Sequence, residues 1–64
     1  MYRLNIVLDN EVIISYKSPI IPRYQEIIYF LHKTFIVKRI GHIVYSRDNQ
    51  NVLAELDLTV EEIL

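Results

Sequence analysis

The stretch Phe-Ile-Val-Lys-Arg-Ile-Gly-His-Ile-Val-Tyr, residues 35–45, decides the fold. Its β-branched content is typical of a strand, but it is too long to be a flat strand of one phase. Phe35 and Val37 share one face of such a strand, whereas Ile40 begins a run of opposite parity. A bulge near Lys38 to Gly41, the only glycine, restores the register, so the sequence predicts a long, bent strand.

The N-terminal part of the chain predicts a β-hairpin. Residues 2–8 alternate, with the even-numbered apolar side chains on the side expected to face the core. Asp9 and Asn10 follow, and both residue types tolerate the positive φ of a tight turn. A β-branched run over residues 12–16 then forms the second strand, which ends at the prolines of residues 18–22.

The segment over residues 22–33 fits two interpretations. Pro22 suits the first turn of a helix, and four apolar residues follow it at helical spacing: Tyr24, Ile27, Ile28 and Leu31. Residues 27–30 are equally a β-rich run before a Leu-His-Lys turn. The sequence pattern alone leaves helix and strand open here.

The C-terminal part of the chain predicts one more strand. Residues 47–51 are an uninterrupted polar turn, and residues 52–58 then alternate between apolar and polar side chains. Residues 59–62, Thr-Val-Glu-Glu, match a capping box, which predicts at most one helical turn at the end of the chain.

The order of residues from Pro22 onward resembles that of small SH3-like β-barrel proteins common in phages and mobile elements. The resemblance covers roughly half of the chain and rests on Pro22-Arg23, Glu26, Ile28, Phe30, a short turn, Phe35, Val37, Ile40 and His42. In that pattern a Gly-Asp pair usually turns the chain after the proline, whereas Tyr24-Gln25-Glu26 stands here. The resemblance implies a mostly β fold, a small five-stranded barrel or strongly bent antiparallel sheet. The competing fold is α+β, a ββαββ arrangement with a helix over residues 22–33.

The size of the chain predicts a single domain over residues 1–64 that needs help to be stable. With no cysteine and only two histidines, disulfides and a structural zinc site are excluded, which leaves oligomerisation. The hydrophobic share of 52% is more than one thin core can hide. We therefore expect a homo-oligomer, with an interface of residues that fall opposite the core positions: Val7, Ile13, Ile27 and Leu53.

The charges are unevenly distributed although the formal net charge is only −1. Between residues 13 and 47 there are six basic residues against Glu26 alone, and from Asp48 onward all charges are acidic. Solvated strand edges explain this pattern, and so does a basic binding face or head-to-tail complementarity between subunits. The low net charge argues against general polyanion binding.

Motifs for chemistry are missing, so we expect no enzyme, no cofactor and no metal site. The serines lack the Gly-x-Ser-x-Gly context of an activated nucleophile. His32 and His42 have no third ligand at a metal-binding spacing, and one glycine cannot build a phosphate-binding loop. His42 in a β-rich segment is more often a hydrogen-bonded structural histidine.

Basic and aromatic residues together suggest a binding site. Nucleic-acid bases stack on aromatic side chains beside cations, which makes six residues candidates for binding a nucleotide or a single strand. They are Arg23, Tyr24, Tyr29, Lys38, Arg39 and Tyr45. Tyrosines are also ordinary sheet residues and basic residues ordinary edge guards, so the pattern is not specific.

Three functions follow as hypotheses. The first is a non-enzymatic protein-interaction module, and the phage resemblance implies an accessory or inhibitor protein acting on a host protein. The second is a small β-barrel that binds nucleotides or single-stranded nucleic acid, and the third is a structural subunit of a larger particle. No apolar run is long enough to span a membrane and no signal peptide is evident, so we expect a cytoplasmic protein.

Overall fold

A computed structural model describes residues 1–43 and 54–63, which form five strands and no helix. No helix in these ranges is long and apolar enough to cross a membrane. The strands are β1 (Tyr2–Leu8), β2 (Glu11–Ser18), β3 (Ile27–Phe30), β4 (Lys33–Ile43) and β5 (Ala54–Ile63). The expected mostly β fold is confirmed, and the α+β alternative is wrong.

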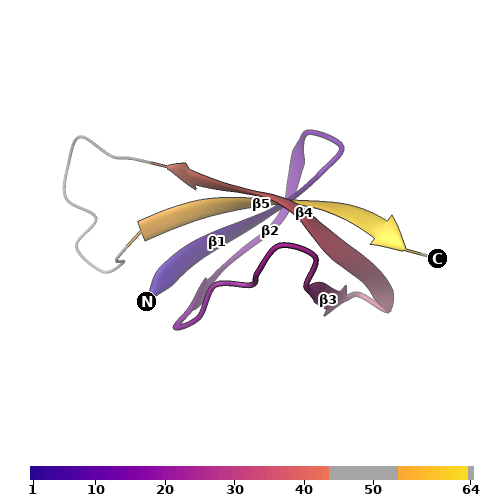
Figure 1. Ribbon diagram of the computed structural model, residues 1–64, viewed down its shortest axis with the longest axis horizontal. Coiled ribbons are helices and arrows are strands. Elements are labelled where there is room, and N and C mark those ends of the chain that lie inside the picture. The colour runs from indigo at the N-terminus through magenta and orange to yellow at the C-terminus, as the bar shows by residue number, and fades with distance from the viewer. Residues whose placement is uncertain (44–53, 64) are drawn as a thin grey trace.

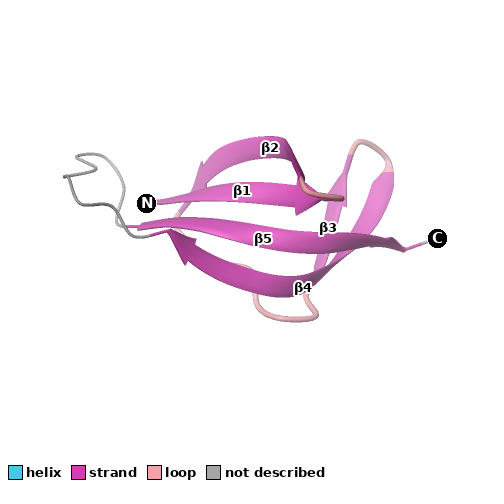
Figure 2. Cartoon of the chain, turned by 90° about the horizontal axis from the view of Figure 1, so that it is seen from above, coloured by secondary structure: helices cyan, strands magenta, loops and turns pink. Residues whose placement is uncertain are grey.

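The five strands form one sheet in the order β2-β1-β5-β4-β3. β1 and β5 pair in parallel, and the other neighbours pair antiparallel. Figures 1 and 2 show that the sheet is strongly twisted and curled into a half-barrel, consistent with a small SH3-like barrel. Because β5 lies between β1 and β4, β2 and β3 are left at the two edges.

The core lies on the concave face of the three central strands. Its buried side chains alternate along each strand, as expected for a sheet with one face turned inward. They are Leu4 and Ile6 from β1, Phe35 and Val37 from β4, and Leu56, Leu58 and Val60 from β5. Side chains of the edge strands pack against this cluster and are themselves only partly buried.

Two tight hairpins have positive φ at both turn residues, the geometry of a type I′ turn. Asp9 and Asn10 have φ of 52° and 66° between β1 and β2, which confirms the predicted hairpin. Leu31 and His32 have φ of 53° and 62° between β3 and β4. Leucine is an unusual residue there, because its side chain disfavours this backbone region.

The bulge predicted for the long strand lies at Lys38. Val37 pairs with Val60 and Arg39 with Thr59, so Lys38 is the extra residue and the side-chain parity changes there. Gly41 does not have positive φ, and an added Cβ would make ordinary contact with the Asp57 carbonyl at 3.8 Å. The bulge at Lys38 therefore changes the side-chain parity of the strand, and its geometry does not require a glycine at position 41.

Ile13 was predicted to lie opposite the core, and this prediction is wrong because β2 contains a second bulge. Ile6 pairs with Ile14 and Val7 with Val12, so Ile13 is the extra residue. A bulge re-aims the side chain of the inserted residue. Ile13 consequently packs against the core together with Ile14, rather than on the opposite face.

Two helical expectations are wrong. Residues 27–30 form β3, because pairing with β4 places Ile28 beside the buried Phe35. Residues 59–62 continue β5, because β4 pairs with this strand as far as Ile63, so no helical turn begins at Thr59. The turn expected at residues 47–51 lies outside the described residues.

Candidate functional site

The two edge strands face each other across an opening that we call the seam. No Cα atom of β2 lies within 8 Å of a Cα atom of β3, whereas paired strands lie about 5 Å apart. The outward-facing amide and carbonyl groups of both edges therefore have no strand partner. The seam is the line along which the half-barrel stays open.

The walls of the seam are apolar. A hollow of about 480 Å³ elsewhere is partly polar, but the seam hollow of about 290 Å³ is lined only by Ile6, Ile14, Tyr16, Ile28, Tyr29 and Phe30. A second hollow of about 180 Å³ continues from it past Phe30 and is lined by Leu8, Ile13, Phe30, Leu31, Lys33 and Phe35. Tyr29 and Leu31, which line these hollows, are 79% and 71% exposed, so large apolar surface borders the seam.

At one end of the seam, a charge on one wall acts on a titratable group of the other. Burial raises the pKa of the Tyr16 hydroxyl above its usual value of 10.0, and the Glu26 carboxylate raises it further. Tyr16 belongs to β2, and Glu26 directly precedes β3. The start of β3 therefore faces the end of β2, as expected for antiparallel neighbours.

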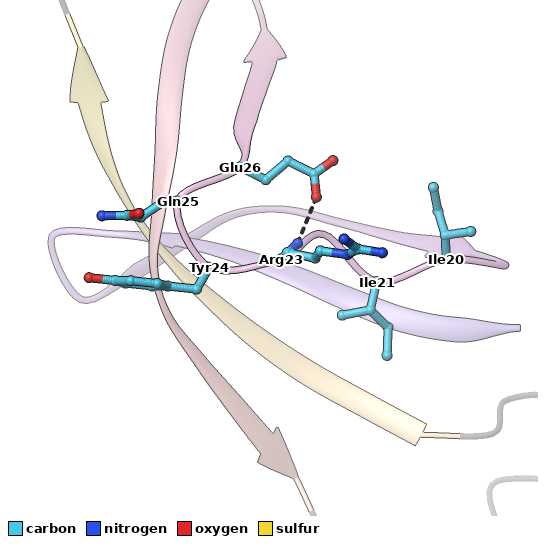
Figure 3. Close-up of a pocket in the computed structure, with 6 residues that line it drawn as sticks. All are labelled: Ile20, Ile21, Arg23, Tyr24, Gln25 and Glu26. Carbon is cyan, nitrogen blue, oxygen red and sulfur yellow. Dashed lines mark hydrogen bonds between the residues drawn. The ribbon is translucent and has the colours of Figure 1, made fainter.

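A tight turn positions Glu26 (Figure 3). The Glu26 amide donates to the Arg23 carbonyl at 3.0 Å, and the Arg23 amide donates to Glu26 Oε1 at 2.7 Å. Gln25 has a φ of 67° at the third position, which is the type II geometry that favours glycine. Hydrogen bonds from Gln25 N to Val37 O and from Val37 N to Glu26 O, at 2.8 and 3.0 Å, fix the turn on β4.

The structure distributes the predicted nucleotide-binding residues over several places. Arg23 and Tyr24 line a hollow of about 480 Å³ with Ile20, Ile21, Gln25 and Glu26, and Tyr24 extends away from Arg23 (Figure 3). Tyr29 lies in the seam. Arg39 is exposed on the outer face beside Thr59. Tyr45 lies outside the described residues.

Lys38 lies among acidic residues. It lines a hollow with Asp9, Glu61 and Glu62, together with Leu8, Asn10, Thr59 and Val60. These carboxylates offset its charge, so Lys38 does not add to the positive potential near Arg23. The five described candidates for base stacking and phosphate contact therefore do not form one surface.

The predicted interface residues also lie at different places in the structure. Val7 is half-buried and pairs with Thr59 on the outer face, and Ile27 is exposed on the same face. Ile13 packs against the core beside the seam. Leu53 lies outside the described residues.

A buried polar network on the outer face was not predicted. Asn5 is 6% exposed, and its Nδ2 donates to Glu55 Oε2 at 2.7 Å and to Asp57 Oδ1 at 2.9 Å. The Ser15 hydroxyl donates to Asn5 Oδ1, so one amide connects β2, β1 and β5. The only sequence signal was that Asn5 and Asp57 occupy polar positions of strands predicted to alternate.

No cluster of three or more His, Cys, Asp or Glu side chains in the described ranges could hold a metal ion. No family model, curated protein or solved structure matches the chain. The resemblance to small phage barrels therefore stays a prediction, and the seam is the feature from which a function can be inferred.

Proposed function

We propose that the protein is a non-enzymatic protein-interaction module that binds an extended protein segment in the seam. One observation carries this proposal: two unpaired strand edges flank an apolar hollow that opens onto the core. In β-augmentation, main-chain hydrogen bonds to a free edge give affinity, and alternate side chains enter pockets. The seam offers both features.

The middle of each edge carries no charged side chain or proline, which supports the proposal, although β3 is short and β2 has the bulge at Ile13. Soluble proteins guard free strand edges with charged side chains or proline along the strand. The described edge strand β3, Ile-Ile-Tyr-Phe, carries neither, and the charges of β2 stand near its ends, at Glu11 and Lys17. The middle of both edges is therefore open to another strand.

The nucleotide-binding alternative has less support. Its residues lie in separate hollows, and Lys38 stands among carboxylates. Phosphate binding depends on basic side chains acting together. The seam requires no such convergence, because its walls are already adjacent.

Site-specific photocrosslinking tests the proposal. p-Benzoylphenylalanine replaces Tyr29 in the seam, and Tyr24, which is also exposed but lines another hollow, provides the matched control position. We expect covalent protein adducts in the expressing cells from position 29 and not from position 24. Equal labelling, or no adduct from position 29, contradicts the proposal.

A substitution pair links those adducts to the seam. Ile28→Asn places an amide in the seam wall, while Ile43→Asn changes a half-buried residue of β4 away from it. We expect the first variant to lose the adducts and the second to keep them. Thermal unfolding of both variants shows whether each remains folded.

A further inference from the structure

We propose that the segment in the seam is an edge strand of a second copy, in a two-fold dimer in which β3 of each chain pairs with β2 of the other. This inference rests on the proposed function, since it names the occupant of the same site. Three features of the chain support it: strand direction, side-chain parity and the charges at the ends of the seam.

The strand directions permit reciprocal pairing. From the pairings across the sheet, β2 runs opposite to β1 and β5, and β3 runs in the same direction as β5. β3 is therefore antiparallel to β2. A two-fold axis along the barrel preserves these directions, so both free edges of each chain find an antiparallel partner. Such an arrangement is closed and leaves no edge for further growth.

Side-chain parity restricts the register. Ile28 and Phe30 of β3, and Tyr16 and Ile14 of β2, all line the core-facing hollow. Placing Ile28 opposite Tyr16 of the second copy also places Phe30 opposite Ile14, so all four stay on the core face. A slip by one residue would turn the two side chains of one strand away from the core face. In the same register Ile27 lies opposite Lys17.

The charges at the two ends of the seam are complementary between copies. Glu26 precedes β3 and lies at the same end of the seam as Lys17 of β2. Lys33, which begins β4 beside Phe30, lies at the other end with Glu11. Within the described residues of one chain, Glu11, Lys17 and Glu26 form no ion pair, and Lys33 reaches only Glu62, at 3.9 Å. An edge strand of this chain therefore fits the seam at both ends and in its apolar middle.

The dimer can be tested by mixing two variants, each of which has one of these charges reversed. In a Lys17→Glu dimer, the introduced carboxylate would lie at the same end of the seam as Glu26 at both contacts, and in a Glu26→Lys dimer two ammonium groups would lie together in the same way. Mixing the two variants restores opposite charges at both contacts of the heterodimer. We expect sedimentation of the unmodified chain to show a dimer, each variant alone to dissociate about tenfold more readily, and the mixture to form heterodimers by native mass spectrometry.

A disulfide trap tests the register, and the chain has no cysteine of its own to interfere. Lys17→Cys and Ile27→Cys, both at exposed positions, are mixed and oxidised; the control mixture pairs Val12→Cys with Ile27→Cys. Disulfides require Cα atoms about 4.4 to 6.8 Å apart, so we expect a covalent heterodimer only from the first mixture.

The outcomes separate this inference from the proposed function. A chain that sediments as a monomer at millimolar concentration, or a Lys17→Cys homodimer forming faster than the heterodimer, overturns the reciprocal dimer. Adducts from position 29 to a different protein, with a monomeric chain, overturn it as well but leave the protein-binding seam in place. Absence of both dimer and adducts overturns both proposals.

Discussion

Leu31 combines two unfavourable features at one residue. Its φ of 53° costs a residue with a branched side chain about 1–2 kcal/mol relative to the ordinary helical or extended regions, and 71% of it is exposed. Asparagine tolerates this backbone region far better. We expect Leu31→Asn to raise the free energy of unfolding by about 1 kcal/mol, measured by urea denaturation.

Leu31→Ala is the control for that substitution, because it removes the apolar side chain but keeps a residue that disfavours positive φ. The stabilisation should be specific to asparagine. Equal stability of the two variants would contradict the assignment of strain to the backbone. If the seam binds a strand, Leu31→Asn should also weaken that binding, since Leu31 lines the hollow beside Ile13.

Tyr16 makes the stability of the fold depend on pH at the alkaline end. Its pKa in the folded chain is raised, first by burial and then by Glu26, so the folded state holds the phenol proton more tightly than the unfolded state. The stabilisation is complete below the unfolded pKa, near 10.0, and is lost as pH rises through the folded value. We expect Tyr16→Phe to remove this part of the alkaline loss, measured by urea denaturation from about pH 8 to about 11.

Glu26→Gln separates the two causes. It removes the carboxylate but not the burial of Tyr16, so the pKa of Tyr16 should stay raised by a smaller amount than in the unmodified chain. The alkaline profile of this variant should therefore still differ from that of Tyr16→Phe. An alkaline profile of Tyr16→Phe that coincides with that of the unmodified chain would count against any contribution from Tyr16.

At the scale of elements, Asn5 fixes β1 against both of its neighbours. One buried amide donates to two carboxylates of β5 and accepts from a hydroxyl of β2. Asn5→Asp keeps the shape but replaces the donor with a third carboxylate. We expect a loss of about 3 kcal/mol at about pH 7, because the introduced carboxylate is buried beside those of Glu55 and Asp57 and removes the amide that donated to both, although the Ser15 hydroxyl can still donate to it.

Asn10→Asp adds the same charge at an exposed turn residue and is the matched control for Asn5→Asp. Aspartate is also favoured in this type of turn, so we expect little change in stability. The loss in Asn5→Asp should shrink as pH falls and the carboxylates become neutral. A pH-independent loss would indicate disturbed packing rather than charge.

The elements that could be predicted are those in which local pattern and pairing agree. Asp9-Asn10 marked a hairpin because both residues tolerate positive φ, and the parity change after Val37 marked the bulge at Lys38. The bulge at Ile13 gave no signal, since its neighbour Ile14 is also apolar. At residues 59–62 the capping-box pattern was overruled by pairing with β4, a tertiary effect that local sequence does not contain.

At the scale of the whole molecule, the seam follows from strand order, which alternation along single strands cannot reveal. The residues of its walls were recognisable as apolar, and Tyr29 was already a candidate for binding. That Ile14 and Ile28 face one another depends on the parallel pairing of β1 with β5, which leaves β2 and β3 at the edges. Sequence reasoning therefore supplied some of the residues of the site but not their arrangement.

The same strand order predicts a gradient of local stability. β5 is paired on both sides and carries three buried side chains, whereas β3 has four residues and one neighbour. Amides of Leu56 to Val60 should therefore exchange with solvent only through global unfolding, and amides of β3 through local opening. We expect hydrogen exchange at micromolar concentration to be slowest in β5 and fastest, among strands, in β3.

Raising the concentration then distinguishes a free edge from a paired one. If β3 pairs with β2 of a second copy, protection of both edge strands should rise with concentration while that of β5 rises only with global stability, because dimerisation stabilises by mass action. Edge amides that remain fast at millimolar concentration would mean that the half-barrel stays open in the absence of another protein. Edge amides as slow as those of β5 at micromolar concentration would contradict the open seam itself.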